Sequence, residues 1–257
     1  VKSKFKYVAG QEFLTLGGIT LIFIIISFAQ FKLPHYLNIT IPLFAVLSAG
    51  YLFGLYTDKK KKLKKILLGF QYFILGVVFI AAILIYFYVF KTESCYSYIW
   101  QSAIGVFIIY YCLKHEFYFY KIITIGAISS VLLNGVLNMH FYPSLLEYQA
   151  GSTMAKTIEK TNIDTDNIYK ISGAHTWALD FYNQEPVKIA SVGDLKYRKD
   201  IWVYASDKEL DILKDSGFDW DRQLTEKQFR ITRLQGKFLN PNTRKKVLNK
   251  MHLVHIY

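Results

Sequence analysis

Residues 66–90 read ILLGFQYFILGVVFIAAILIYFYVF and contain no Asp, Glu, Lys or Arg. This composition is typical of a helix that crosses a membrane, because about 20 apolar residues, each rising ~1.5 Å, cover ~30 Å of hydrocarbon. Four other stretches of the chain are similarly apolar. The sequence therefore predicts five transmembrane helices, at about residues 13–31, 37–57, 66–90, 96–113 and 120–139.

Charge divides the 257-residue chain into two parts near residue 140. Residues 1–139 hold 13 Lys or Arg and 4 Asp or Glu, whereas residues 140–257 hold 18 and 15. Charged side chains are excluded from the bilayer centre, where each costs about 2.5–3.5 kcal/mol on insertion scales. We therefore predict a transmembrane domain over 1–139 and an extracytoplasmic α/β domain over 140–257. The 17% aromatic content excludes a disordered chain, and two cysteines exclude a disulfide-stapled mini-domain.

The lysines of the first part predict the orientation of the spans. They gather before the first span, between the second and third, and between the fourth and fifth. Because positive loops stay cytoplasmic, we expect the N-terminus inside and the 140–257 domain outside. The lysine run between 59 and 65 could bind nucleic acid, but its place beside a span favours anionic lipid. A lipid bilayer, and no nucleic acid, is therefore the expected partner.

The second part alternates patterns typical of helices and strands, which favours one small α/β domain. Helices are expected at 144–160, 175–182, 206–217 and 243–250. Strands are expected at 167–171, 187–191, 201–205, 228–234 and 251–256.

No zinc motif, glycine-rich phosphate loop or nucleophile elbow occurs in the sequence. His252 and His255 are three apart in an expected strand, so they point to opposite faces and no metal pair is expected. The pairs Asp164-Thr-Asp166 and Asp219-Trp-Asp221 are interpreted as polar turns. A divalent cation held by such a pair is the alternative, and no other cofactor is indicated.

The loop between the first two spans reads Phe31-Lys32-Leu33-Pro34-His35-Tyr36-Leu37 and is a short connection for two spans. It places a lysine and a histidine at the outer surface beside an interfacial tyrosine. Cations at this depth can meet a lipid phosphate. Equally, Lys32 can extend to the interface and Tyr36 can join an aromatic belt, as plain anchors. The residues themselves leave both interpretations open.

The Lys-Leu-Pro-His-Tyr stretch, with Ile41-Pro42-Leu43 and the small residues Ala45, Ser48, Ala49 and Gly50, resembles a known family. It is similar to the second half of bacterial GT-C fold membrane glycosyltransferases, which are related to the 4-amino-4-deoxyarabinose lipid A transferase and the protein O-mannosyltransferases. The likeness covers most of the chain, including Phe141-Tyr142-Pro143 after the last span, but only the Lys-Leu-Pro-His-Tyr stretch is specific.

This resemblance implies transfer of a sugar from a polyprenyl-phosphate donor to a lipid, glycan or protein acceptor. The reaction would take place at the outer, periplasmic face of a bacterial inner membrane. Lys32 would stabilise the negative charge that develops on the leaving polyprenyl phosphate, with His35 as a second donor and Tyr36 as an interfacial contact.

The family's acidic residue that activates the acceptor belongs to the N-terminal half and has no counterpart here. The outer loops of residues 1–139 hold one carboxylate, Glu93, and it matches no motif of the family. We therefore expect the chain to be the C-terminal portion of such an enzyme, with the missing N-terminal half as partner and no catalytic residue visible. The alternative is a non-catalytic membrane-anchored receptor or assembly module whose outer α/β domain binds a partner.

Overall fold

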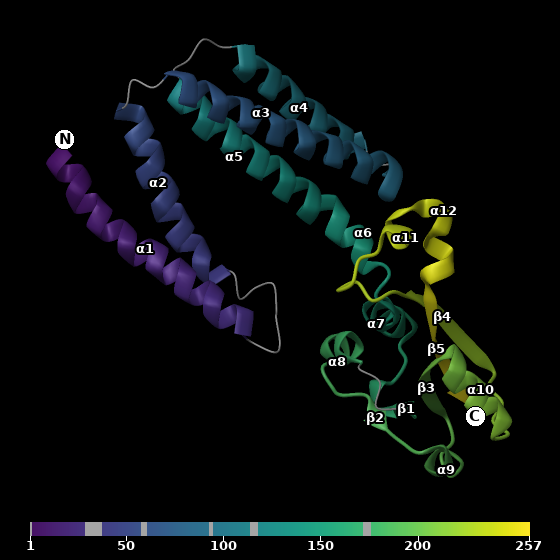
Figure 1. Cartoon of the computed structure of the whole chain (residues 1–257). Helices are drawn as coiled ribbons and strands as arrows, with labels where there is room; N and C mark the ends of the chain where they lie inside the picture. Colours follow the sequence, from purple (N-terminus) through teal and green to yellow (C-terminus); the bar gives the residue numbers. More distant parts are fainter. Residues whose placement is uncertain (1, 29–37, 58–60, 93–94, 114–117, 172–175) are drawn as a thin grey trace. The chain divides into compact units, whose positions relative to one another are not determined.

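The computed structural model describes residues 2–28, 38–57, 61–92, 95–113, 118–171 and 176–257 (Figure 1). It divides into two compact units, one formed by residues 1–75 and 107–128 and the other by 76–106 and 129–257. The change of composition near residue 140 falls inside the second unit, because the ends of two long helices fold together with the sheet. The division into domains at residue 139 stays a prediction.

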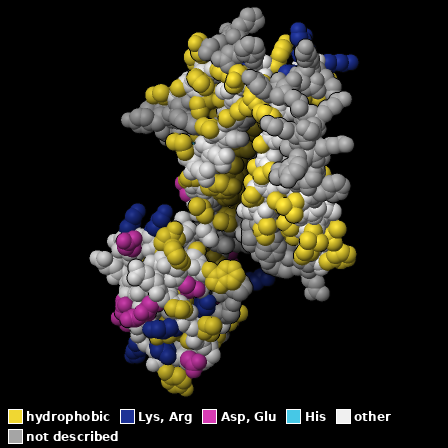
Figure 2. Space-filling model, turned by 90° about the vertical axis from the view of Figure 1, so that its left-hand side faces the viewer, with side chains coloured by type: hydrophobic (Ala, Val, Ile, Leu, Met, Phe, Trp, Pro, Cys, Tyr) yellow, Lys and Arg dark blue, Asp and Glu magenta, His cyan; other side chains and the backbone are white. Residues whose placement is uncertain are grey.

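Long helices occupy the apolar stretches of the sequence. They are α1 (Lys2–Phe28), α2 (Ile41–Thr57), α3 (Lys61–Leu84), α4 (Cys95–Leu113) and α5 (Tyr118–Val136). Their surfaces carry many hydrophobic side chains, as expected where lipid replaces water (Figure 2).

Three of the described helices are long and apolar enough to cross a membrane. They cover Asn38–Leu55, Lys61–Val89 and Tyr118–Leu146. Shorter apolar helices cover Leu14–Phe28 and Ser102–Tyr111, within α1 and α4. The structure therefore supports three of the five predicted spans and membrane association of the chain.

Two π-helical turns extend α3 and α5 within the second unit. They are η2 (Ile85–Val89) and η3 (Leu137–Phe141), and η3 leads directly into α6 (Tyr142–Leu146). The turns meet where the ring of Tyr86 stacks on His140 at 4.3 Å between centroids. His140 Nε2 also donates to the carbonyl oxygen of Phe90 at 2.6 Å. A π turn frees backbone carbonyls from the regular helical ladder and often marks a functional position.

The second unit contains one mixed sheet in the order β2-β1-β3-β5-β4. Its strands are β1 (Ile168–Lys170), β2 (Lys188–Ile189), β3 (Ile201–Ser206), β4 (Arg222–Gln228) and β5 (Asn249–Ile256). β1 is parallel to β2 and β3, whereas β5 is antiparallel to both β3 and β4. The longest strand therefore lies between two antiparallel partners, which makes β5 the best-paired strand.

Helices cover both faces of the sheet, as the α/β interpretation requires. α7 (Ala150–Thr161) and α8 (Trp177–Asn183) share a buried cluster with Ile168, Tyr204 and Leu253. α9 (Val192–Leu195) and α10 (Asp207–Asp215) bury the opposite face with Val203 and Val254. Alternation along β3 and β5 sends successive side chains to these two cores.

A third buried cluster joins the sheet domain to the ends of α3 and α5. It contains Phe90, Phe141, Leu145, Phe229 and Phe238. Phe238 lies in α11 (Gly236–Leu239), which is followed by α12 (Pro241–Arg244) and the 3-10 turn η5 (Lys245–Val247). The rings of Phe229 and Phe238 stack at 3.9 Å. The segment before β5 is thus fixed to the membrane-length helices by aromatic packing.

Three elements of the second part differ from those expected. In place of the strand expected at 228–234, the structure has β4 at Arg222–Gln228. The polar sequence of β4, RQLTEKQ, does not indicate a strand, and β4 forms because it pairs with the edge of β5. The helix expected at 243–250 gives way to strand at Asn249, because β3 and β4 pair with β5 on both sides. The helix expected at 144–160 is broken at residues 147–149 into α6 and α7.

Candidate functional site

The loop that the sequence singled out lies outside the described residues. Lys32, His35 and Tyr36 all fall within 29–37, and Glu93 also falls outside. The proposed contact of Lys32 and His35 with a lipid phosphate therefore stays a prediction. The described chain resumes at Asn38 and enters α2 at Ile41.

A pocket of about 720 Å³ opens among the helices of the first unit. Its lining comes from α2 (Leu47, Ser48, Tyr51, Leu52), α3 (Leu67, Gln71) and α5 (Ile122, Ile123, Gly126). Six of these nine residues have no polar side-chain atom. Ser48, Tyr51 and Gln71 supply the hydrogen-bonding groups. An apolar cavity with a few polar groups is the usual form of a small-molecule site.

Gly126 shapes this pocket by having no side chain. A Cβ atom placed there would lie 3.5 Å from Gln71 Oε1, so the Gln71 amide rests directly against α5. This is the position expected of a polar residue between membrane helices. Nearby, Tyr111 donates its hydroxyl to Thr124 Oγ1 at 2.9 Å, which ties α4 to α5 within the same unit. The pocket can accept an apolar chain and offer it one amide and two hydroxyls.

Other polar residues of the apolar stretches bond within their own helix. Asn134 Nδ2 donates to Ser130 O and Asn138 Nδ2 donates to Asn134 O, each at 2.9 Å. Both side chains are exposed. Each of these bonds is made to a backbone carbonyl of the residue's own helix, one turn earlier.

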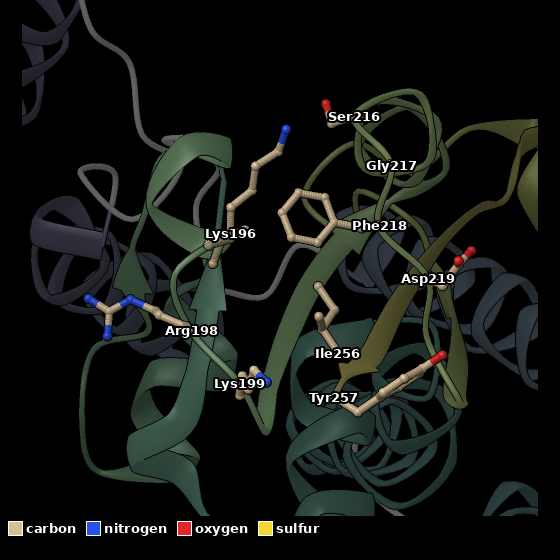
Figure 3. A pocket seen from close by; sticks show the side chains of 10 residues that line it. Lys196, Arg198, Lys199, Ser216, Gly217, Phe218, Asp219, Ile256 and Tyr257 are labelled. Carbon is tan, nitrogen blue, oxygen red and sulfur yellow. The ribbon is translucent and has the colours of Figure 1, made fainter.

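A second cavity of about 470 Å³ lies in the sheet domain (Figure 3). Lys196, Arg198 and Lys199 form one wall, and the residues from Ser216 to Asp219 form the other. Arg198 turns away from the cavity and donates to Tyr169 Oη at 2.9 Å, with its guanidinium 4.7 Å from that ring's centroid. The lining therefore includes lysines on one wall and Asp219 on the other, which gives the cleft mixed charge, although the Asp219 carboxylate points away from the lysines.

His252 and His255 of β5 lie on opposite faces of the sheet, as the sequence predicted, and the structure adds that both bind carboxylates. His252 is buried, with Nε2 2.8 Å from Asp207 Oδ1. His255 lies between two carboxylates, with Nδ1 2.6 Å from Asp221 Oδ1 and Nε2 2.8 Å from Asp200 Oδ1. Burial alone would lower the pKa of His255, but its hydrogen bonds to the two carboxylates outweigh burial and raise that pKa.

Within the described ranges, no group of three or more His, Cys, Asp or Glu side chains is placed to hold a metal ion. Asp164 accepts from the backbone N–H of Asp166 at 3.1 Å and from Asn167 Nδ2 at 2.9 Å. The turn interpretation of this pair is confirmed. Asp221 of the second pair instead binds His255, which lowers the pKa of Asp221.

Arg244 is the residue whose role the sequence did not indicate. It donates from Nη2 to Val89 O at 2.5 Å, from Nε to Phe238 O at 2.9 Å, and from Nη1 to Tyr148 Oη at 3.1 Å. Its guanidinium also lies 4.6 Å from the centroid of the Phe90 ring. The Asn240-Pro241 pair signals the start of α12, but nothing distinguishes Arg244 from the lysines that follow it.

Comparison with family models, curated proteins and solved structures found no match to this chain. The resemblance to the membrane glycosyltransferases therefore rests on the residues quoted from the sequence and stays a prediction.

Proposed function

We propose that this chain forms part of a membrane glycosyltransferase that moves a sugar from a polyprenyl-phosphate donor to a lipid, glycan or protein acceptor. Lys32 and His35 would bind the donor phosphate at the outer surface, and Tyr36 would line that site. The apolar tail of the donor would extend from there into the membrane helices. The sheet domain would help to select the acceptor.

The observation that supports this proposal is the pocket lined by α2, α3 and α5. Its volume of about 720 Å³ and its mainly apolar lining suit several isoprene units better than a sugar or a nucleotide. α2 is also the helix that follows the Lys32–Tyr36 loop. A phosphate held at the loop and a tail held beside α2 belong to one amphipathic ligand.

The proposal includes the finer topology. All five apolar helices would cross a bacterial inner membrane, with the N-terminus in the cytoplasm and the sheet domain in the periplasm. α1 and α4 would complete their spans with residues next to the apolar segments Leu14–Phe28 and Ser102–Tyr111.

The test is photocrosslinking of the full-length protein in liposomes with a diazirine-bearing polyprenyl phosphate. Gly126→Leu fills the pocket, and we expect it to lose most of the crosslinking. Gly69→Leu is the matched control, because Gly69 is exposed on α3 and has no atom within 4 Å of a built Cβ. In the Lys32→Ala variant, unlabelled polyprenyl phosphate should compete less well against crosslinking by the diazirine-bearing lipid. Equal crosslinking in both glycine variants, with no effect of Lys32→Ala, would refute the proposal.

The mixed-charge cleft of Figure 3 favours one alternative, a receptor or assembly module whose sheet domain binds a soluble partner. Replacing Lys196 and Lys199 by Gln distinguishes the receptor or assembly module from the glycosyltransferase. The module predicts loss of partner binding with the lipid crosslinking intact. The glycosyltransferase predicts loss of crosslinking only from the pocket and loop variants.

A further inference from the structure

α8 carries an exposed aromatic face on the sheet domain. Trp177, Phe181 and Tyr182 are 73%, 77% and 54% exposed. Trp177 and Phe181 are four residues apart, so they lie on one side of the helix. Its other side is buried, because Leu179 is fully enclosed and Ala178 packs against α7. α8 is therefore amphipathic, and aromatic side chains form its outer face.

The fold holds α8 close to the end of the α5 span. A Cβ built at Gly151 would lie 3.0 Å from Leu179 N and 3.2 Å from Ala178 Cβ, so α8 touches the first turn of α7. That turn follows Leu146 by five residues, which cover at most about 18 Å when fully extended. The chain between them turns, with Tyr148 N donating to Leu145 O and Gln149 N to Leu146 O. The real separation is therefore shorter.

The apolar surface of the span continues up to this point. Met139, Tyr142 and Leu146 are 66%, 46% and 45% exposed and lie three and four residues apart, on one face of η3 and α6. The membrane-length helix that contains them ends only at Leu146. Because each polar interfacial layer of a bilayer is about 5–8 Å thick, the first turn of α7 lies at or near that layer.

Aromatic side chains are the residues that this layer favours, since each combines a large apolar body with a polar edge or a polarisable ring. A bilayer surface would cover the aromatic face of α8.

We infer that the aromatic face of α8 docks in the interfacial layer of the same membrane that the helices cross. This contact gives the sheet domain a second attachment, separate from the span that leads into it. It fixes the side of the domain that faces the lipid, independently of the catalytic role proposed above.

The inference is tested with nitroxide labels on the full chain in phosphatidylcholine–phosphatidylglycerol liposomes, after Cys95→Ser and Cys112→Ser. Phe181→Cys carries one label. Tyr197→Cys carries the matched control, because Tyr197 is a 91%-exposed aromatic that follows α9 on the opposite face of the sheet. We expect the label at 181 to be protected from a water-soluble nickel complex and accessible to oxygen, and the label at 197 to be the reverse.

A second measurement leaves Phe181 and both cysteines in place. Fluorescence quenching by a lipid that carries a nitroxide near its headgroup is compared between the unmodified chain and Trp177→Phe. The difference isolates Trp177, and we expect most of its emission to be lost to the lipid-borne quencher. Equal nickel accessibility at 181 and 197, or a Trp177 signal quenched only by soluble acrylamide, would overturn the inference. Such a result would assign the face to a soluble ligand or partner.

Discussion

Replacing Arg244 by Met should release the segment before β5 from the end of α3. The guanidinium donates to the carbonyl oxygens of Val89 and Phe238 and to the hydroxyl of Tyr148. Hydrogen bonds to a charged group contribute about 1.5–3 kcal/mol each when buried, and less where solvent reaches them. Arg244 is half-buried, so we take the lower end for each bond.

Three bonds at that lower end, reduced for exposure, amount to roughly 3 kcal/mol. The stacking over Phe90 is partly retained by the thioether of Met, so it adds little to the difference. A local opening free energy reduced by about 3 kcal/mol corresponds to a rise of roughly a hundredfold in amide exchange. Arg244→Lys keeps the charge but loses the planar fork, and should give about half of this free-energy loss.

The assay is amide hydrogen exchange of the full chain in liposomes, followed at Leu239 and Asn240. Both amides donate within α11, to Gln235 O and Gly236 O. Lys245→Met is the matched control, because it removes an exposed charge at the next position. In a double-mutant cycle, Tyr148→Phe should couple to Arg244→Met by about 1 kcal/mol. If exchange in Arg244→Met equals that in Lys245→Met, Arg244 does not hold this junction.

Two further substitutions test the packing and the titration of the sheet domain. Gly151→Ala should destabilise it by about 1 kcal/mol in thermal unfolding, because overpacking against the backbone of α8 exceeds the helix propensity gained, whereas Gly236→Ala, with open space at its Cβ, should not. His255→Gln should lower stability most at mildly acidic pH, because a raised histidine pKa stabilises the fold below the unfolded value near 6.5 and this contribution is lost as pH rises through the folded pKa. The pKa of Asp221 is lowered instead, so its contribution to stability is lost only as pH falls below about 4. In chemical unfolding from pH 5 to 9, the free energies of unfolding of wild type and His255→Gln should therefore converge on the alkaline side. A constant difference between them across that range would contradict a stabilising, raised pKa at His255.

The sequence predicted best what a single segment decides for itself. A charge-free run such as 66–90 has one stable form in lipid, a helix, so the helical course of α3 follows from composition, whereas its π-helical end at Ile85–Val89 does not. The helix expected at 206–217 is present as α10, and Ser206 begins it with a capping box in which its backbone N–H donates to Glu209 at 2.7 Å. Each of these features needs only residues close by in the chain.

Features that depend on distant residues were missed for the same physical reason. β4 is a polar edge strand, and only the neighbouring β5 makes it a strand rather than a loop. Arg244 contacts Val89, which is 155 residues earlier, and no local pattern marks that pair. Of the candidate site, Gln71 is visible as a polar residue within the apolar 66–90 run, but its contact with Gly126 on another helix is not.

The junction explains why the change of composition near residue 140 falls inside the second compact unit. β5 pairs with both β3 and β4, so the sheet is complete only when this late strand is in place. The residues just before β5 supply Phe238 and Arg244, which pack on Phe90 and bind Val89 at the end of α3. Completing the sheet and attaching the domain to the membrane helices therefore use adjacent residues. A perturbation at Arg244 should propagate to β5, whereas one at Lys245, which only faces solvent, should not.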